Sequence, residues 1–274
     1  MSARTSTNSL KSVKVVCKNL RGSMPDVDDI NDRQLKVPGF DQKKLDEAIA
    51  AVIGGGGLMG PVLTGSLRKG LGEIHEFDGD TVELANLNRQ NFTDLHIGKN
   101  KAISLAYNSL SDGYMGSTII AYPYYFQEAL ERGLDVRFDV IVCGVDNDDT
   151  RVFVSRYGLD HGIPVVFSAV SDDANHGYVF VQQVGGACFG CAFPRALIPH
   201  PTPCPGTPAA KDILNVMSGF SLYAIDSLLM DRKRTWNYRM IHLAGYAPDS
   251  KQLIERNPEC PLCGVVEEPI HETT

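Results

Sequence analysis

The chain has 274 residues, enough for one large or two small domains, and its 26 basic and 33 acidic side chains give a formal net charge of −7. The acidic balance and the lack of a long basic run argue against nucleic acid as the main partner, and the lack of any apolar stretch of about 18 residues argues against a membrane span. The first residues lack the apolar core of a secretory signal, so we expect a cytoplasmic protein.

The first half of the chain predicts alternating helices and strands. Residues 1–30 are polar, and we expect a partly flexible extension in which VKVV (13–16) forms a short edge strand. The pattern then predicts a helix running into a buried strand over 40–53, a helix over 58–70, a strand over 72–80, a helix over 99–110 and a strand over 117–126.

The second half continues this alternation. It predicts a buried strand over 138–146, a helix over 150–162, a buried strand over 163–170, an antiparallel strand over 178–184, a helix over 212–230 and a late strand over 235–243. The proline-rich stretch 199–208 has the composition of an exposed crossover loop. Together the elements predict one α/β domain over 31–274, built on a doubly wound, mostly parallel, Rossmann-like sheet whose ligands bind at the carboxyl ends of the strands.

The stretch GGGGLMG (54–60) joins a predicted buried strand to a predicted helix. Glycines such as Gly54, Gly56 and Gly57 let a backbone approach phosphate, and the following helix offers its N-terminal amides. The dinucleotide fingerprint G-x-G-x-x-G is incomplete, because Met59 stands at its third glycine and Gly60 comes one residue late. On this stretch alone, a phosphate loop and an ordinary tight turn both remain open.

Polar and charged residues follow the next predicted strand. Asp78 and Asp80 end it, about 20 residues after the loop, where an acid that binds a ribose is expected. Several amides and cations come shortly afterwards: Asn86, Arg89, Gln90 and Lys101. A nicotinamide enzyme has little use for this positive charge, whereas an enzyme that cleaves a triphosphate uses it to stabilise the developing charge.

Several motifs in a fixed order resemble the ubiquitin-activating-enzyme (E1-like) superfamily, which includes the bacterial adenylyltransferases that act on thiamine and molybdopterin sulfur carriers. The resemblance runs from residue 31 to residue 264. The motifs that carry it are NDRQLKVPGF (31–40), DGDTVELANLNRQ (78–90), IGKNKA (97–102), CGVDNDDTR (143–151) and two C-x-x-C pairs. It implies an ATP-binding half over 31–170, and over 171–274 a half with the zinc site, the crossover loop and the partner-binding surface.

The resemblance also implies roles for single residues. Gly57 and its neighbours would approach the ATP phosphates, Asp78 would bind the ribose hydroxyls, and Asp146, followed by Asn147, would hold Mg²⁺. The triphosphate would be held by Asn86, Arg89 and Lys101, and Gln90 would be a further residue that binds the nucleotide. Arg33 would be an arginine finger that reaches into the partner subunit's site in a homodimer. We expect Asp148 and Asp149 to begin a helix instead of binding a ligand, since acids favour a helix N-terminus.

Four of the seven cysteines form two C-x-x-C hooks, Cys188 with Cys191 and Cys260 with Cys263. Two such hooks predict a tetrahedral, structural zinc site that ties the C-terminal part of the chain to the sheet. Cys204 lies outside both hooks on the predicted crossover loop, where the resembling family carries the cysteine that accepts an acyl group as a thioester. A bystander thiol is the alternative, because some adenylyltransferases of this family need no such cysteine.

The leading hypothesis is an enzyme that uses ATP to adenylate the C-terminal glycine carboxylate of a small ubiquitin-like (β-grasp) protein. Thioester formation on Cys204 and transfer to a conjugating enzyme would follow. The alternative within the family is a sulfur-carrier adenylyltransferase without an essential thioester. Two further hypotheses are a nicotinamide-dependent oxidoreductase, which leaves Arg89, Lys101 and Asp146 unexplained, and a zinc-stabilised binding module without catalysis.

Overall fold

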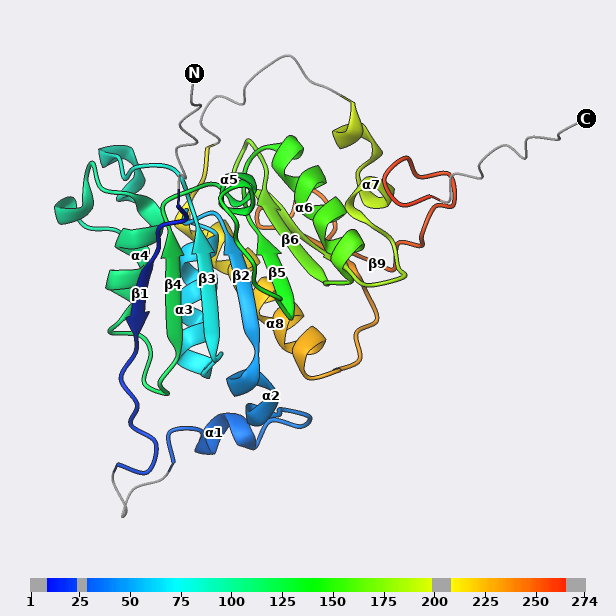
Figure 1. The fold of residues 1–274 in the computed structure, drawn as a ribbon. Coiled ribbons are helices and arrows are strands. Elements are labelled where there is room, and N and C mark those ends of the chain that lie inside the picture. Colours follow the sequence, from blue (N-terminus) through cyan, green and yellow to red (C-terminus); the bar gives the residue numbers. More distant parts are fainter. Residues whose placement is uncertain (1–8, 24–28, 199–207, 265–274) are drawn as a thin grey trace, which may run out of the picture.

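A twisted sheet of nine strands organises the computed structural model, which describes residues 9–23, 29–198 and 208–264 (Figure 1). The strands are β1 (Val13–Val16), β2 (Ile49–Ile53), β3 (Glu73–Phe77), β4 (Thr118–Tyr122), β5 (Val140–Cys143), β6 (Val165–Val170), β7 (His176–Gln182), β8 (Tyr238–His242) and β9 (Ser250–Gln252). Their spatial order is β1-β4-β3-β2-β5-β6-β7-β8-β9. Strands β4, β3, β2, β5 and β6 are parallel, and the others pair antiparallel at the two sides.

Helices cover both faces of this sheet. The α-helices are α1 (Asp32–Leu35), α2 (Gln42–Glu47), α3 (Met59–Lys69), α4 (Lys101–Ser109), α5 (Phe126–Glu131), α6 (Asp148–His161), α7 (Phe189–Ala192) and α8 (Lys211–Leu229). Short 3₁₀ turns are η1 (Leu84–Asn86), η2 (Asp94–His96) and η3 (Pro194–Leu197). In Figure 1, α3 and α8 lie behind the sheet, and α5 and α6 lie in front of it.

Each face of the sheet has its own apolar core. Side chains from α3, α4 and α8 pack on one face, with Leu63, Leu105 and Met217 fully buried among them. Side chains from α5, α6 and α7 pack on the other, around Phe126 and Phe167. Because both faces are covered, the central strands read as continuous apolar runs, as strands of parallel sheets do. The doubly wound, mostly parallel α/β fold predicted from the sequence is confirmed.

Several short elements differ from the sequence predictions, and helices α1 and α7 were not predicted at all. The strand predicted over 117–126 ends at Tyr122, and helix α5 begins at Phe126 because its first residues pack on the aromatic cluster around Phe77. Strand β9 extends the sheet beyond the predicted late strand, where it pairs with β8. By contrast, the antiparallel strand β7 and the edge strand β1 lie where the sequence placed them.

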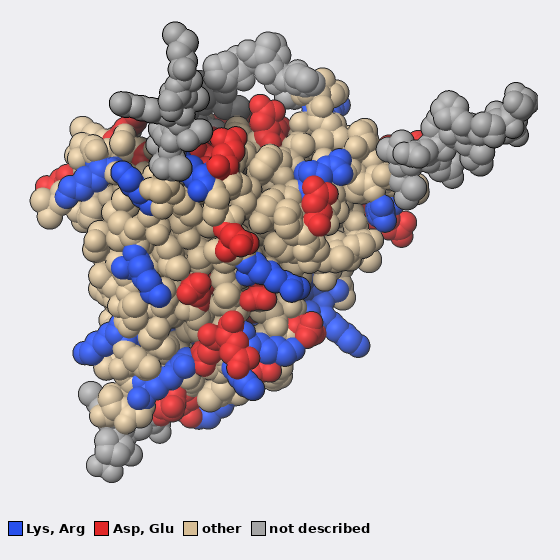
Figure 2. Space-filling model, in the orientation of Figure 1, with Lys and Arg blue, Asp and Glu red and all other residues tan. Residues whose placement is uncertain are grey.

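The surface carries charges of both signs. Figure 2 shows Lys and Arg side chains interspersed with Asp and Glu over the visible face. Within residues 9–23, 29–198 and 208–264, none of the helices combines the length and apolar character that crossing a bilayer requires.

Candidate functional site

A cleft of about 730 Å³ opens at the carboxyl ends of the parallel strands. Strand β2 lies between β3 and β5, so the chain leaves β2 toward one side of the sheet and later returns on the other. This reversal is the topological switch point at which open α/β sheets bind ligands. The predicted site residues that line the cleft are Gly54, Gly56, Gly57, Asp78, Asn86, Arg89, Gln90, Lys101, Asp146 and Asn147.

The glycine loop between β2 and α3 forms the floor of the cleft. Gly54 has φ +101°, a conformation that side chains rarely adopt, and its amide donates to Phe77 O at 2.9 Å. A Cβ at Gly57 would lie 2.8 Å from Leu214 Cδ1 and 3.1 Å from Arg89 O. Glycine is therefore required here for backbone geometry and for close packing, and the loop presents bare backbone to the cleft.

An acidic wall follows β3. Asp78 is nearly buried, and its carboxylate accepts hydrogen bonds from the Gly55 amide at 2.7 Å and the Asp80 amide at 2.8 Å. Burial raises the pKa of Asp78, and the charge of Lys101 and these two amides offset part of that rise. One carboxylate oxygen of Asp78 is thus fixed by the glycine loop, which ties the acid to the floor of the cleft.

Lys101 and Asp80 form an ion pair at the edge of this wall. Lys101 Nζ lies 2.8 Å from Asp80 Oδ2, and the Tyr125 hydroxyl donates to Asp80 Oδ1 at 2.5 Å. Burial tends to raise the pKa of Asp80, but the hydrogen bonds from Lys101 and Tyr125 outweigh it, so that pKa is lowered. The same bond to Asp80 raises the pKa of Tyr125 to about 12. Lys101 is already paired with the Asp80 carboxylate. An anionic ligand that binds Lys101 would have to share it with Asp80 or displace Asp80.

The segment after the acidic wall carries the predicted amides and Arg89, whose guanidinium donates to Ala85 O at 2.5 Å and to Asn88 Oδ1 at 3.2 Å. Asn86 is buried, and its side-chain oxygen accepts from the Glu83 amide at 2.9 Å, closing a capping box around η1. Lys211, at the start of α8, donates to Arg89 O at 3.1 Å and to Asn91 Oδ1 at 2.9 Å. The backbone of this segment is thereby held against α8, while the Arg89 guanidinium borders the cleft.

The wall opposite the acids follows β5. Asp146 is exposed and borders the cleft, and the Asn147 side chain caps α6 by accepting from the Thr150 amide at 2.9 Å. Helix α6 begins at Asp148, with Asp149 also in its first turn, as predicted. Arg151 donates to Asp148 Oδ1 at 2.8 Å and to Val145 O at 2.7 Å, so the Asp148 carboxylate is neutralised, and the carboxylates of Asp146, Asp149 and Asp172 also border the cleft.

Arg33 lies at the other end of the sheet. It belongs to α1, which precedes β2, and its side chain is 88% exposed. Arg33 does not line the cleft of its own chain. Figure 1 shows α1 and α2 together below the amino end of β2.

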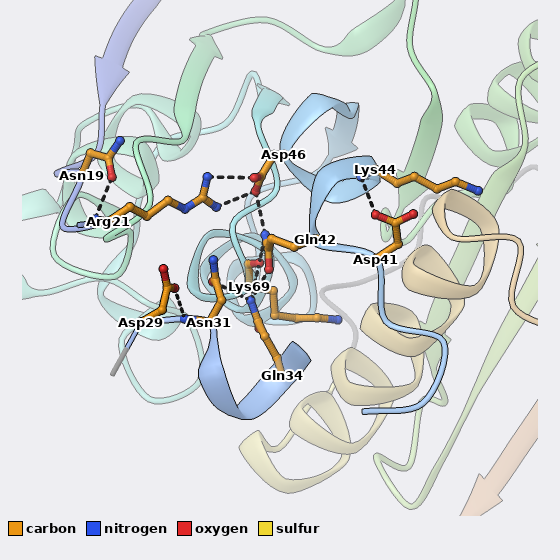
Figure 3. A network of polar contacts seen from close by, with 10 residues as sticks. All are labelled: Asn19, Arg21, Asp29, Asn31, Gln34, Asp41, Gln42, Lys44, Asp46 and Lys69. Atoms are coloured by element: carbon orange, nitrogen blue, oxygen red, sulfur yellow. Dashed lines mark hydrogen bonds and ion pairs between the residues drawn. The ribbon is translucent and has the colours of Figure 1, made fainter. Parts of the chain in front are cut away.

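A hydrogen-bond network fastens α1 to the rest of the domain (Figure 3). Gln34 donates to Asn31 Oδ1 at 3.0 Å, to Lys69 O at 3.2 Å and to Gln42. Gln42 in turn donates to Asp46 Oδ1 at 2.6 Å. Although α1 buries none of its own residues, it has a fixed orientation with Arg33 pointing to solvent.

The four hook cysteines come together beside α7. All four Sγ atoms lie within 4.8 Å of one another, with Cys188 and Cys260 3.6 Å apart and Cys191 and Cys263 3.4 Å apart. A tetrahedral zinc with bonds of about 2.3 Å places its sulfurs about 3.8 Å apart, so the donor set and spacing fit zinc. The Asn257 amide also donates to Cys191 Sγ at 3.4 Å. In Figure 1 the C-terminal loop lies next to α7.

Three residues that line the cleft were not predicted as site residues, although one of them, Arg151, ends the motif 143–151. These residues are Tyr125, Arg151 and Tyr178. Tyr125 lies three residues past the end of β4, but the predicted strand ran to residue 126, so no signal in the sequence identified it. Cys204 lies outside the described residues.

Comparisons with known proteins agree with this geometry. A family model described as the ThiF family matches residues 31–262. The sulfur carrier protein adenylyltransferase of Thermus thermophilus is 30% identical over 232 residues, which cover 81% of this chain and 84% of that protein. The adenylyltransferase and sulfurtransferase MOCS3 of Arabidopsis thaliana is 32% identical over 68% of this chain, and the match spans 40% of that longer protein.

Two further comparisons concern the modifier-activating branch and the fold. The ubiquitin-like modifier-activating enzyme 5 of Drosophila willistoni is 30% identical over 56% of this chain and 41% of that protein. The crystal structure of E. coli MccB superposes with a TM-score of 0.70 at 18% identity, covering 85% of this chain and 69% of that one. The solved structure shares the fold of this chain.

Proposed function

The chain belongs to the ThiF family, and from that premise we propose that it is an ATP-dependent adenylyltransferase. Its proposed substrate is the C-terminal glycine carboxylate of a small β-grasp protein, either a ubiquitin-like modifier or a sulfur carrier. The observation that best supports this is the convergence of a bare glycine loop, a fixed carboxylate and two cations, Arg89 and Lys101, in one cleft opposite Asp146.

The cleft offers a place for each part of the nucleotide. The amides of Gly54 and Gly55 are bonded to Phe77 O and to Asp78, so Gly56, Gly57 and the start of α3 would supply the backbone amides for phosphate oxygens. Asp78, held by the Gly55 amide, is the acceptor for the ribose hydroxyls. Asn86, Arg89, Gln90 and Lys101 line the side where a triphosphate would extend.

Asp146 is the residue that would hold Mg²⁺, with Asn147 beside it. An exposed carboxylate at the carboxyl end of a strand supplies the oxygen ligand that this ion prefers. When bound, the ion neutralises negative charge on the phosphates. The cysteine cluster would hold Zn²⁺ in a structural role, away from the reaction.

The proposed reaction forms one bond and breaks one. A carboxylate oxygen of the small protein attacks the α-phosphorus of ATP, and the bond from that phosphorus to the bridging oxygen breaks. Pyrophosphate leaves with the electron pair, and an acyl-adenylate remains. Arg89 and Lys101 stabilise the charge that develops, and the cleft supplies the rest of the rate by positioning.

Two fates of the acyl-adenylate are compatible with the chain. In the leading proposal the Cys204 thiolate displaces AMP and forms a thioester, which then passes to a conjugating enzyme. In the alternative the acyl-adenylate goes directly to sulfur chemistry and Cys204 is dispensable. The sequence relatives include both a sulfur-carrier enzyme and a ubiquitin-like modifier enzyme, so both fates are kept.

Arg33 is proposed to act in the cleft of a second copy of the chain. Its exposure, its distance from its own cleft and the fixed orientation of α1 support this role. The proposal therefore includes a homodimer, in which an arginine from each subunit would add positive charge at the partner's phosphates.

Thermal unfolding with and without nucleotide tests the choice of ligand. Mg·ATP is expected to raise the unfolding midpoint, NAD is not, and Asp78→Ala is expected to abolish the ATP effect. A comparable shift with NAD would favour the oxidoreductase. No shift with either nucleotide would favour a binding module without catalysis.

A further inference from the structure

A second carboxyl group lies buried behind the acidic wall. Glu76 sits in β3 with 0% of its surface exposed, and neither of its carboxyl oxygens has a hydrogen-bond partner among the described residues. Buried polar groups are almost always hydrogen-bonded, so an acid in this state calls for an explanation.

Glu76 and Asp78 converge beneath the glycine loop. A Cβ built at Gly55 would lie 3.0 Å from Glu76 Oε1 and 3.3 Å from Asp78 Oδ2. The two carboxyl groups therefore occupy the space that a side chain at residue 55 would need. This contact explains why the loop carries glycine at a position where the backbone has no left-handed φ.

The two acids differ in the hydrogen bonds and nearby charges that stabilise their ionised forms. Asp78 accepts from the amides of Gly55 and Asp80 and lies near the Lys101 ammonium. Glu76 has no comparable partner, and an unsupported ionised carboxylate in the interior is strongly disfavoured. Burial and the nearby charge of Asp78 raise the pKa of Glu76 well above its usual value.

Among the described residues around Glu76, the charged neighbour is Asp78. In register across the sheet, Glu76 pairs with Val52 on β2 and Ala121 on β4, which are uncharged. Beyond Asp78, the ammonium of Lys101 pairs with Asp80. A second negative charge on Glu76 would thus repel Asp78 without a cation of its own to offset it.

We propose that Glu76 and Asp78 hold one proton between them at neutral pH, that it resides on Glu76, and that Glu76 thereby keeps Asp78 ionised as the acceptor for a ligand's hydroxyl groups. Glu76 is a positioning residue, since it does not line the cleft. The identity of the ligand as the ribose of ATP rests on the proposed function. The protonation of Glu76 does not, because it concerns the free protein.

Carbon-13 NMR of protein labelled at the glutamate side-chain carboxyl tests the proton directly. The Glu76 resonance is assigned by its absence in Glu76→Gln, with Glu73→Gln on the same strand as the matched control. At neutral pH we expect the Glu76 carboxyl carbon to have the chemical shift of a protonated acid. In Asp78→Asn we expect its titration midpoint to fall, because the neighbouring negative charge is gone.

Nucleotide affinity tests the consequence. Glu76→Gln is a permanently neutral isostere, so its affinity for a non-hydrolysable Mg·ATP analogue is expected to match wild type near neutral pH. Glu76→Leu serves if the amide variant does not fold. A carboxylate resonance for Glu76, a midpoint unchanged in Asp78→Asn, or a loss of about tenfold or more in affinity in folded Glu76→Gln would each overturn the proposal. If neither the wild-type protein nor any variant binds ATP, the proposed function is wrong. The NMR result still decides whether Glu76 is protonated.

Discussion

The side chain of Met59 fills the space left by the missing side chain of Gly144. A Cβ at Gly144 would lie 2.6 Å from Met59 Cε and 2.7 Å from Met59 Cγ, and Met59 is fully buried. Met59 stands where the phosphate-loop fingerprint has its third glycine. A Cβ built at Gly60 would meet its nearest neighbour, Asn91, at 3.5 Å, which is an ordinary contact distance. The close approach of α3 to the sheet is therefore made at Gly144 and not at Gly60.

This relationship predicts a coupled pair of mutations. Gly144→Ala is expected to cost about 1–3 kcal/mol by overpacking, and Met59→Ala about 2–5 kcal/mol by leaving a cavity. The double variant should lower the free energy of unfolding by clearly less than the sum of the two single variants, because the added methyl group enters the cavity. Urea unfolding of the four proteins measures the coupling, and additive costs would show that the two residues do not compete for one space.

Asp146 and Arg89 are predicted to be needed for chemistry and not for folding. Asp146→Ala and Arg89→Ala should reduce partner-dependent exchange of pyrophosphate into ATP by on the order of a hundredfold or more, since each removes charge stabilisation from the transition state. Circular dichroism should be unchanged. Asp160→Ala, at an exposed acid on α6 away from the cleft, is the control. Full exchange in either cleft variant would remove the role assigned to that residue.

The cysteine cluster predicts bound zinc. Elemental analysis should find one zinc per chain, lost in Cys191→Ser and kept in Cys17→Ala, whose thiol is buried outside the cluster. Structural zinc contributes about 10 kcal/mol or more in small domains, so the cluster variant should also unfold at a lower temperature. Zinc retained in Cys191→Ser, or absent from wild type, would contradict the assignment.

Glu76 predicts a pH dependence of stability with a defined sign. The pKa of Glu76 is well above 4.5 in the folded chain and near 4.5 when unfolded, so the folded state binds the extra proton. Its contribution to stability is fully present below pH 4.5 and is lost as the pH rises toward the folded pKa. Relative to Glu76→Gln, the wild-type free energy of unfolding should fall by about 1.4 kcal/mol per pH unit above 4.5. Parallel urea-unfolding profiles for the two proteins would contradict a protonated Glu76.

Long apolar runs made the fold predictable from the sequence. Segments such as 138–146 and 163–170 are too apolar to be anything but buried strands, and the helices between them fixed a parallel sheet. Short elements carried too little signal. Helix α1 buries none of its residues, so no apolar period marks it, and α5 begins directly after a strand-like aromatic stretch.

The site was predictable where one motif supplied several ligands. Asp78, Asn86 and Arg89 lie within one stretch of the chain and reach the same wall of the cleft. Tyr178 reaches it from β7, a distant antiparallel strand, and only the three-dimensional packing brings it there. Glu76 was missed because three of the five residues of its strand, EIHEF, are polar, which is typical of a partly exposed strand, whereas the structure buries every residue of this strand except Glu73.

The most direct measurement is the intact mass of both proteins after incubation of this chain with Mg·ATP and a small glycine-ended β-grasp protein encoded near it. We expect the small protein to gain the mass of one adenylate, or this chain to gain the small protein as a reductant-sensitive adduct. That adduct should be absent in Cys204→Ala, which should still exchange pyrophosphate. If the two proteins form a complex and ATP binds, yet neither species forms, the chain is not an adenylyltransferase for that partner and the proposed function is wrong.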